Sequence, residues 1–419
     1  MRVLHVANGY WPAIGGTEFL IQKVSEHLVA LFGDEVTVYV PNGYNCEAFR
    51  SPTHPTLPPG SEVINGVTVR RFGVFAWAGP VLRYLQQIAY LLRLPGNDRL
   101  RTFYNGPIIR GLEREIAAFP CDVVAASAFP MRHMFYSVRA RQMGGAPTVL
   151  IGALHVEEPW GFDRPMIYQA IRQADAYIAY TDFERDFLVT QKGIPAEKIA
   201  VIGVGVDAEQ LARADGTAVR ARYGWGNESV VAFIGQQSRD KGVDTLVQAM
   251  PRVWEEFPTA RLLIAGGRTE FSPQLRRMVA ALPPGQRSQV TIVDSFPEDE
   301  KAALFAACDV FASPSRYESF GIVYLEAWAA GKPVIGCRTG AVSTVIAEGQ
   351  DGLLVPHGDS SSLASALLIT LRDPALRREM GERGRAKVRA NHTWEKVTGK
   401  FRAVYEGAVK SSKHGGTSS

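Results

Sequence analysis

The chain has 419 residues, of which 46% are hydrophobic and 21% are charged. A chain of this length exceeds what one hydrophobic core normally supports, so we expect two domains of about 200 residues each. The net charge of +4 is too small to indicate a nucleic-acid partner.

The cysteines and the first residues of the chain indicate its compartment. No two cysteines have the Cys-x-x-Cys spacing of a zinc site; they are Cys46, Cys121, Cys308 and Cys337. Such scattered thiols are typical of a cytoplasmic protein. His5 and Asn8 interrupt the opening apolar run too early for a secretory leader, and no apolar run approaches the roughly 18 residues that cross a bilayer. We therefore expect a cytoplasmic protein.

The first half of the chain alternates short apolar runs with helix-forming segments. We expect a buried strand over 3–7, a loop through Gly15 and Gly16, and a helix from about Thr17 with one apolar face. Residues 42–62 predict an irregular excursion, followed by a hairpin about Asn65-Gly66 within 63–69. Further strands are predicted at 36–40, 123–125, 149–152 and 176–179.

The second half repeats this alternation. Six short buried strands are predicted at 230–234, 262–265, 290–293, 310–312, 333–335 and 352–355. With helices between them, they predict a second doubly wound parallel sheet. We expect an N-terminal domain over 1–207, a C-terminal domain over 208–392, a last helix over 393–410 that docks on the first domain, and a disordered tail over 411–419.

Residues 313–337 carry the strongest functional signal. Glu318 lies in a short loop rich in Ser and Gly, Gly321 would let a ligand approach the backbone, and Glu326 lies within a predicted helix. A helix N-terminus has free N–H groups that suit a phosphate. Carboxylates on either side of it suit hydroxyl-rich groups, so the segment predicts a sugar-nucleotide site. For one glutamate alone, a surface carboxylate beside a helix dipole is the simpler interpretation.

In order and spacing, short motifs along nearly the whole chain resemble the retaining glycosyltransferases of family 4. The motifs are Gly15-Gly16-Thr17-Glu18, Ala174-Asp175 through Thr181, Gly205-Val206-Asp207, Phe233-Ile234-Gly235 to Lys241-Gly242, Ser313-Pro314-Ser315, Glu318 to Glu326, and Gly352-Leu353-Leu354-Val355-Pro356. The resemblance implies an α/β protein with the GT-B fold, in which two Rossmann-like doubly wound domains face a central cleft.

The resemblance also implies roles for single residues. Glu318 would contact hydroxyls of the donor sugar, Glu326 would bind the ribose, and Lys241 would hold the diphosphate. The expected catalytic residues are Glu318, Lys241 and His155, and the expected donor-binding residues are Gly16, Gln236, Arg239, Lys241, Phe320, Gly321, Ile322 and Glu326. Taken alone, Gly15-Gly16 would be a turn.

Gln236 departs from the family pattern. Resembling enzymes have an arginine at this position, which holds the donor diphosphate together with the lysine. Arg239, two residues before Lys241, could supply the missing guanidinium from a different backbone position. The amide of Gln236 could still donate to a phosphate oxygen, but without charge assistance.

His155 follows a buried run, at the carboxyl end of a predicted strand, where resembling enzymes often have a histidine near the sugar. A lone histidine is more often structural. Either neighbouring acid, Glu157 or Glu158, could act as the general base of an inverting enzyme. The resemblance implies retention instead, with the leaving phosphate deprotonating the acceptor and no protein nucleophile.

The acidic run Glu298-Asp299-Glu300 is the strongest candidate for a metal site. It precedes an Ala-rich and Leu-rich helix, however, and acidic residues are ordinary at a helix start. A lysine and a helix dipole on the diphosphate leave no need for a metal, so we expect neither a metal nor another cofactor.

Residues 74–112 are apolar and cationic, since their only acid is Asp98. Against it stand five arginines, Arg83, Arg93, Arg99, Arg101 and Arg110. Such a segment suits an anionic membrane surface or a phosphorylated lipid acceptor. The simpler interpretation is a pair of core-packing helices whose arginines reach solvent.

Together these features predict an enzyme that transfers a hexose from a UDP- or GDP-sugar to a glycan, lipid or small-molecule acceptor, with retention of configuration. Two alternatives remain open. One is an epimerase or phosphorylase of the same fold, although a phosphorylase would need a lysine for pyridoxal phosphate and usually a longer chain. The other is a sugar-nucleotide-binding protein that has lost transfer activity, which the departure at Gln236 favours and the intact glutamate pair disfavours.

Overall fold

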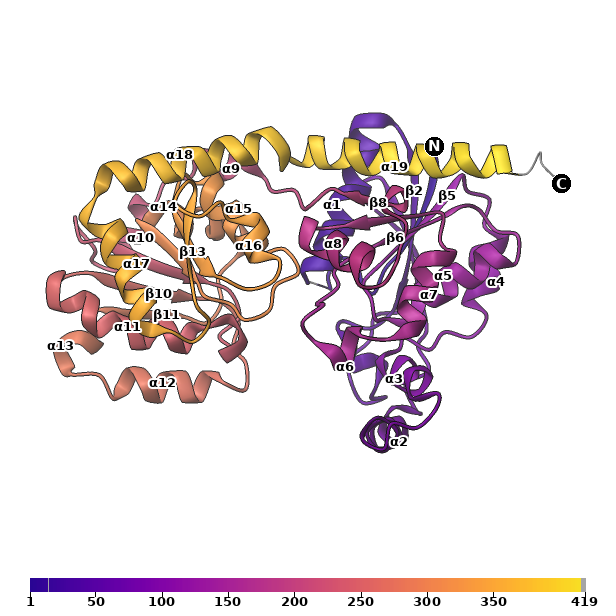
Figure 1. Cartoon of the computed structure of the whole chain (residues 1–419), viewed down its shortest axis with the longest axis horizontal. Helices are drawn as coiled ribbons and strands as arrows, with labels where there is room; N and C mark the ends of the chain where they lie inside the picture. Colours follow the sequence, from indigo (N-terminus) through magenta and orange to yellow (C-terminus); the bar gives the residue numbers. More distant parts are fainter. Residues whose placement is uncertain (14, 416–419) are drawn as a thin grey trace. The chain divides into compact units, whose positions relative to one another are not determined.

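The structure is a computed structural model that describes residues 1–13 and 15–415, with the side chains of 414 and 415 left out. The chain divides into two compact units. Unit 1 comprises Met1–Val204 and the chain from Trp394 onward, and unit 2 comprises Gly205–Thr393. Figure 1 shows both units as sheets with helices around them.

Unit 1 is built on a sheet in the order β3-β4-β2-β1-β5-β6-β7-β8. Neighbouring strands are parallel except for the antiparallel pair β3 and β4. Its described strands are β1 (Arg2–Val6), β2 (Glu35–Pro41), β3 (Gly60–Ile64), β4 (Val67–Phe72), β5 (Val123–Ser127), β6 (Thr148–Ile151), β7 (Ala176–Ala179) and β8 (Ile199–Val201). The inner strands are buried along their length because helices cover both faces.

The helices of unit 1 include one that returns from the far end of the chain. In chain order they are α1 (Gly16–Phe32), η1 (Cys46–Phe49), α2 (Gly79–Leu91), α3 (Asn97–Asn105), α4 (Leu112–Ala118), α5 (Arg132–Gln142), α6 (Pro159–Phe162), α7 (Pro165–Gln173), α8 (Asp182–Thr190), η2 (Ala196–Lys198) and α19 (Trp394–Gly415). Helices α2 and α3 lie side by side (Figure 1).

Unit 2 is built on a wholly parallel sheet in the order β11-β10-β9-β12-β13-β14. Its described strands are β9 (Val230–Ile234), β10 (Arg261–Ala265), β11 (Val290–Val293), β12 (Val310–Ser313), β13 (Val334–Cys337) and β14 (Gly352–Val355). Its helices are α9 (Ala208–Arg213), α10 (Thr217–Arg222), η3 (Arg239–Lys241), α11 (Val243–Glu256), α12 (Ser272–Ala280), α13 (Pro284–Arg287), η4 (Glu298–Glu300), α14 (Lys301–Ala307), α15 (Ile322–Ala329), α16 (Val342–Val345), α17 (Ser360–Arg372) and α18 (Pro374–Asn391).

The fold confirms the predicted α/β class, with two doubly wound parallel sheets. All six predicted strands of the second half are present within a residue or two. In α11 the buried side chains Leu246, Met250 and Val253 recur at helical spacing and face the strands of the sheet. The hairpin about Asn65-Gly66 is also present, with Ile64 opposite Val67. Both turn residues have positive φ, as this tight turn requires.

Three details differ from the sequence predictions. The hairpin begins at Gly60, inside the predicted excursion over 42–62. The first residues of this strand, 60–62, are Gly, Ser and Glu and are exposed, so no apolar pattern indicates them. The edge strand β8 was not predicted, because three residues are too short for a periodic signal. The two units meet at 204/205, a few residues before the predicted boundary at 207, since the Val206 amide bonds His392 within unit 2.

The last helix docks on unit 1 through one buried face. Phe401 and Tyr405 of α19 are buried, and His5 of β1 lies 3.0 Å from the Tyr405 hydroxyl. The disordered tail predicted over 411–419 is wrong for 411–415, because α19 continues to Gly415. The Ser412 hydroxyl accepts a hydrogen bond from Arg141, which anchors this last part. Residues 416–419 lie outside the described residues.

No helix in the described part of the chain combines the length and apolar character needed to cross a membrane.

Candidate active site

A glycine turn positions the N-terminus of α15 in unit 2. Gly321 has φ of 89°, and a Cβ atom there would lie 2.5 Å from the Tyr324 ring, so no other residue fits without a shift. The Tyr324 hydroxyl donates to the Ser313 carbonyl over 2.6 Å, which ties α15 to the end of β12. The free amides of the first helical turn, at Ile322 and beyond, therefore lie near the carboxyl edge of the sheet. Phe320 packs beneath this turn, with its ring 5.6 Å from that of His392.

Lys241 and Glu318 form an ion pair beside this helix. The Lys241 Nζ atom lies 2.6 Å from Glu318 Oε1, across 77 positions of sequence. The loops that carry them pack tightly, because Gly242 has φ of 72° and a Cβ there would overlap the Pro314 carbonyl. The two side chains are 31% and 12% exposed, so a ligand can still reach the lysine. The structure thus brings together two of the three predicted catalytic residues.

Glu326 lies one turn further along α15 and is almost fully buried. Lys301 Nζ lies 2.5 Å from its Oε1 atom, while Oε2 is buried without a hydrogen-bond partner among the described residues. Burial raises the pKa of Glu326, and Lys301 opposes that rise. Burial lowers the pKa of Lys301, but the charges of Glu326 and Glu298 outweigh it, so the net shift is upward. Glu326 therefore keeps one acceptor oxygen with no protein donor.

Sequence reasoning missed Lys301. It begins α14 directly after the acidic run 298–300, and a lysine there is ordinarily solvated. Two residues of the acidic run form ion pairs with basic side chains: Glu300 pairs with Arg222, and Glu298 lies 3.5 Å from Lys301. Only the packing of α14 beside α15 reveals that Lys301 reaches Glu326.

Gln236 and Arg239 differ in what they offer a ligand. Gln236 is exposed in the loop after β9. Arg239 lies 3.5 Å from Asp244, and its guanidinium lies 5.4 Å from the centre of the Phe271 ring. In the structure Arg239 therefore contacts Asp244 and Phe271, and not the Lys241–Glu318 pair. Its contact with the donor diphosphate stays a prediction.

Gln237, the next residue, was also missed. It is fully buried, and its Nε2 atom donates to the Gly266 carbonyl over 2.9 Å and to Asp294 over 3.0 Å. Hydrogen bonds from Arg268, Gln237 and Arg276 lower the pKa of Asp294. These bonds join the loops that follow β9, β10 and β11, and so fix the backbone on either side of Gln236.

In unit 1, the predicted Gly16 begins α1 and follows the extended N-cap Gly15. The Glu18 carboxylate lies against Gly15, where a Cβ atom would overlap it. This carboxylate accepts a hydrogen bond from Asn8 over 2.6 Å. Burial raises the pKa of Glu18, while its own backbone amide and Asn8 oppose the rise. A carboxylate thus already lies at the first turn of α1, where a phosphate was expected.

His155 lies in the loop after β6, with its ring 5.2 Å from that of Phe162. Of its acidic neighbours, Glu157 is exposed, and Glu158 caps α6 by accepting from the Gly161 amide over 3.0 Å. Burial raises the pKa of Glu158, with the Gly161 bond opposing it. Glu158 therefore already has a structural role.

Glu184 hydrogen-bonds to the loop that carries His155, and sequence reasoning missed it as well. It is buried and accepts hydrogen bonds from the Tyr177 hydroxyl, from the Tyr180 amide over 3.0 Å and from the Leu154 amide over 3.4 Å. Gly152 passes so close that a Cβ atom would lie 2.5 Å from the carboxylate. Burial raises the pKa of Glu184 to about 7, with the hydrogen bonds opposing the rise. The carboxyl group therefore titrates near neutrality.

Two family models match the chain, one over each unit. The model described as Glycosyltransferase Family 4 matches residues 14–210. The model described as Glycosyl transferases group 1 matches residues 217–387, which include Lys241, Glu318 and Glu326. Together they span most of the chain.

Curated relatives match about half of the chain. A protein named D-inositol 3-phosphate glycosyltransferase from Segniliparus rotundus is 31% identical over 245 residues, which are 58% of this chain and 54% of the relative. One of the same name from Kribbella flavida is 33% identical over 226 residues, 51% of this chain and 52% of the relative. The matches thus span little more than half the length of these relatives.

Solved structures match nearly the whole chain at low identity. Sucrose-phosphate synthase from Thermosynechococcus elongatus has a TM-score of 0.73 at 20% identity, covering 98% of this chain and all of that one. Anabaena HepE in complex with UDP and glucose has a TM-score of 0.71 at 18% identity, covering 97% of this chain and all of that one. At such identities the likeness shows the fold.

Proposed function

Because the chain belongs to the glycosyltransferases of family 4 and has the GT-B fold, we propose that it transfers a hexose from a sugar nucleotide to an acceptor hydroxyl, with retention of anomeric configuration. The observation that carries this proposal is the Lys241–Glu318 ion pair beside the glycine-opened start of α15. An ammonium group and free helix amides suit a diphosphate, and a carboxylate beside them suits the hydroxyls of the attached sugar.

Donor binding would rearrange the Lys241–Glu318 pair. In the structure the ammonium of Lys241 is neutralised by Glu318. A diphosphate carries more negative charge, so it would take over Lys241 and release Glu318 to accept hydrogen bonds from sugar hydroxyls. Glu326 would accept a hydrogen bond from the ribose through its unpartnered Oε2. Lys301 would keep Glu326 charged for that purpose.

The transfer step needs no protein nucleophile. The bond between the anomeric carbon and the diphosphate oxygen breaks, and a bond from that carbon to the acceptor oxygen forms on the same face. The acceptor proton passes to the leaving diphosphate. Lys241 and the α15 amides would stabilise the charge that develops on the leaving group. We assign His155 to a contact with the donor sugar and the backbone of Gly16 to a contact with the second phosphate. That phosphate would compete with the Glu18 carboxylate for the first turn of α1.

We further propose that the donor is a UDP-sugar and that no metal is required. The HepE structures contain UDP and UDP-glucose, and a GDP-sugar is the alternative donor. Lys241 and the dipole of α15 supply positive charge where a metal would otherwise act. For the acceptor we propose a glycan, a lipid or a phosphorylated polyol, since relatives carry the name D-inositol 3-phosphate glycosyltransferase.

A peripheral membrane contact is the second part of the proposal, with the protein in the cytoplasm at the inner membrane face. The observation that favours it is the exposure of large apolar side chains along α2. They lie on one helical face and are Val81, Tyr84, Leu85, Ile88 and Leu91, between 48% and 76% exposed. Core-packing helices, the simpler interpretation of residues 74–112, would bury this face.

Gln236 favours one alternative, a protein that binds the donor without transferring the sugar. Gln236 has no guanidinium group, and Arg239 pairs with Asp244 in the structure. An epimerase of this fold would instead release nucleotide and an altered sugar without any acceptor. These alternatives differ from transfer in their products, so product analysis separates them.

The test is a thermal-shift screen against UDP-, GDP- and ADP-sugars, followed by product analysis with the stabilising donor. A ligand at a hundredfold excess over its Kd adds about 2.7 kcal/mol of stability, so the true donor should raise Tm clearly. Lys241→Ala should reduce this added stability to about half, and Lys400→Ala, an exposed lysine on α19, should keep it. No rise with any sugar nucleotide would contradict the proposal. A rise without transfer to any acceptor would support the inactive alternative.

A further inference from the structure

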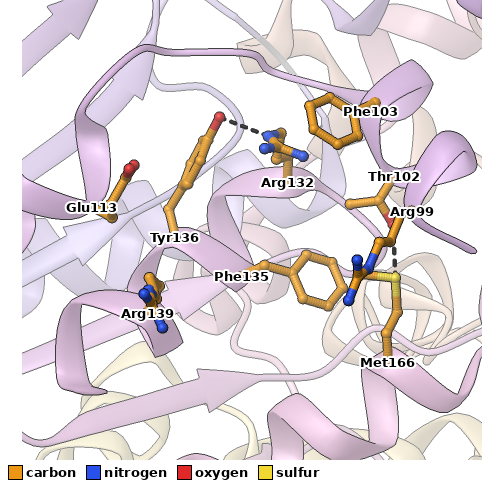
Figure 2. A pocket seen from close by; sticks show the side chains of 9 residues that line it. All are labelled: Arg99, Thr102, Phe103, Glu113, Arg132, Phe135, Tyr136, Arg139 and Met166. Carbon is orange, nitrogen blue, oxygen red and sulfur yellow. Dashed lines mark hydrogen bonds between the residues drawn. The ribbon is translucent and has the colours of Figure 1, made fainter. Parts of the chain in front are cut away.

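A pocket in unit 1 lies between α3, α4, α5 and α7, and none of the predicted site residues lines it. It encloses about 300 Å³, at the lower end of the range for small-ligand sites. Figure 2 shows its lining, which combines cationic and aromatic side chains. The lining residues are Arg99, Thr102, Phe103, Glu113, Arg132, Phe135, Tyr136, Arg139 and Met166.

Arg132 is fixed in this pocket, and its terminal nitrogens form no hydrogen bond with any described residue. Its Nε atom donates to the Tyr136 hydroxyl over 2.6 Å, as the dashed line in Figure 2 marks. Its guanidinium lies 3.6 Å from the centre of the Phe103 ring and 5.0 Å from that of Tyr136. Held between two rings, Arg132 presents a preorganised pair of N–H donors, which matches a phosphate group.

The charge of the lining favours an anion. Arg132 and Arg139 lie on one face of α5, seven residues apart, and Arg99 reaches the pocket from α3. Within the described part of the chain none of these three guanidinium groups forms an ion pair with a carboxylate, and Arg139 bonds only the Gln142 amide oxygen, over 3.3 Å. The lining thus contributes three guanidinium groups and one carboxylate, that of Glu113.

Glu113 indicates a second property of the ligand. Its Oε2 atom is buried and has no hydrogen-bond partner among the described residues. A buried carboxylate oxygen without a donor is costly, so a ligand hydroxyl would stabilise it. The pocket therefore suits a phosphate group whose neighbouring part carries a hydroxyl.

Helix α2, which carries the apolar face, packs on α3, one of the helices that line this pocket. Helix α2 packs along α3, and the Tyr90 ring of α2 lies 4.8 Å from the Arg101 guanidinium of α3. On the same α3, Phe103 is 37% exposed and lines the pocket. Arg83 and Arg93 are exposed around the apolar face, while Asp98, the only acid between 74 and 112, is paired with Arg101. An apolar helix surrounded by arginines is complementary to an anionic bilayer.

We propose that this pocket binds the phosphate headgroup of an anionic lipid that carries a hydroxyl, while α2 inserts its apolar face among the acyl chains. The inference rests on the membrane contact proposed above and assigns it a specific headgroup site. Arg132 and Arg139 bind the phosphate, Glu113 accepts from the headgroup hydroxyl, and Val81, Leu85 and Ile88 enter the bilayer.

The test is co-sedimentation of the full chain with phosphatidylcholine vesicles, with and without phosphatidylglycerol. Wild type should bind the vesicles that contain phosphatidylglycerol at least about tenfold more tightly. Arg132→Lys keeps the charge but loses the forked geometry, and Arg139→Gln removes a charge; each should weaken this binding about fivefold. Arg114→Gln, an exposed arginine of α4 outside the pocket, removes the same charge and should stay within about twofold.

Two further measurements are needed. One separates the contribution of the α2 face from that of the pocket, and the other distinguishes a lipid headgroup from a free phosphate ester as the ligand. Leu85→Ser with Ile88→Ser should abolish binding to both kinds of vesicle, and Ile369→Ser, an exposed apolar residue of α17, should not. Calorimetry with glycerol 3-phosphate tests a soluble occupant. Binding of glycerol 3-phosphate that Arg132→Lys removes, without any vesicle binding, would overturn the lipid assignment.

The pocket assignment fails if Arg132→Lys and Arg139→Gln bind vesicles that contain phosphatidylglycerol as tightly as Arg114→Gln does. In that outcome the membrane contact through α2 still stands if the Leu85 and Ile88 substitutions abolish binding. UDP binding by each variant, measured in parallel, reports on the proposed donor site, which contains none of the substituted residues. If the proposed donor site is wrong, the wild type will not bind UDP, and this result is independent of the vesicle-binding measurements.

Discussion

Glu326 in unit 2 and Glu184 in unit 1 are both buried carboxylates, but they are stabilised in different ways. Glu326 faces a lysine at 2.5 Å and retains an unpartnered oxygen. Glu184 accepts hydrogen bonds from Tyr177, Tyr180 and Leu154, and no lysine or arginine of the described residues forms an ion pair with it. Glu326 thus keeps an acceptor oxygen that the proposed ribose contact would use, whereas the oxygens of Glu184 bind donors of the fold.

Glu318 extends this comparison, since it too is paired with a lysine. If lysine-paired carboxylates bind the ligand, Glu318→Gln should remove charge where the donor sugar reacts and lower kcat by about a thousandfold, comparable to the loss of an electrostatic catalytic group. UDP affinity should change by no more than about threefold, because Lys241 remains. Steady-state kinetics and calorimetry measure the two effects. Glu379→Gln, which is exposed and pairs with Arg383 on α18, is the matched control. Unchanged kcat in Glu318→Gln would falsify the role of Glu318.

Lys301→Met should leave Glu326 as a buried carboxylate without a cation, like Glu184, but without the hydrogen bonds that stabilise Glu184. Removing one partner of a buried pair leaves an uncompensated charge, so we expect a loss of about 3 kcal/mol in the free energy of unfolding at pH 8. The loss should shrink toward pH 5, because the pKa of Glu326, already raised by burial, rises further and the neutral carboxyl forms. Urea unfolding at both pH values measures this.

Arg139→Gln is the control for the lysine substitution, because Arg139 has no carboxylate partner within the described residues. It should change the free energy of unfolding by no more than about 0.5 kcal/mol at either pH. Equal losses in Lys301→Met and Arg139→Gln would show that the Glu326 pair contributes no more than a surface arginine.

Glu184 gives the pH dependence expected of a buried carboxyl without a cation. Its pKa is raised to about 7 in the folded state, above about 4.3 in an unfolded chain. The folded state therefore binds more protons between these values, and its stability falls as the pH rises through that window. At about 1.4 kcal/mol per pKa unit, the loss above pH 7 is at most about 4 kcal/mol.

Glu184→Gln removes this titration and should flatten the stability profile between pH 5 and 8. Glutamine has one acceptor oxygen, whereas the Leu154 amide donates to Oε1 of Glu184 and the Tyr180 amide to Oε2. The variant therefore loses one of these bonds and should unfold at lower urea concentration than the wild type at pH 5. The measurement is a series of urea unfolding curves across that range. A wild-type profile that is as flat as that of the variant would show that Glu184 does not titrate there.

Lys241→Ala should have the smallest of these effects. Loss of one charge-assisted contact, together with repulsion from the unpaired Glu318, should weaken UDP binding by about tenfold. Uridine has no diphosphate, so its affinity should stay within about twofold. Calorimetry with both ligands makes the comparison, and equal losses for UDP and uridine would contradict the contact between Lys241 and the diphosphate.

The sequence predicted the fold because the signals that determine it are local. The apolar runs of β9 and β12 and the glycine at Gly321 report burial and backbone geometry within a few residues. The Glu318 and Glu326 positions followed from motif spacing, and the structure puts both at α15. The exposed strand β3 and the short β8 gave no such signal, since neither has an apolar period.

The contacts between distant segments could not be predicted in this way. Lys301 and Glu184 are ordinary helix residues in the sequence, and only packing shows that one reaches Glu326 and the other supports the loop before His155. Likewise, only the structure shows that the Arg239 side chain contacts Asp244 and Phe271. The apolar face of α2 was visible in the sequence, but its exposure was not.

By itself, the sequence determined two α/β units, the glycine turns and the family, because hydrophobic period, glycine and motif order act over short stretches of chain. Only the tertiary structure decided which charges meet. It paired Lys241 with Glu318 and Lys301 with Glu326, and it left three arginines around one pocket without a carboxylate partner among the described residues. The physical reason is that electrostatic energy depends on distance and burial, which arise when segments far apart in sequence pack together.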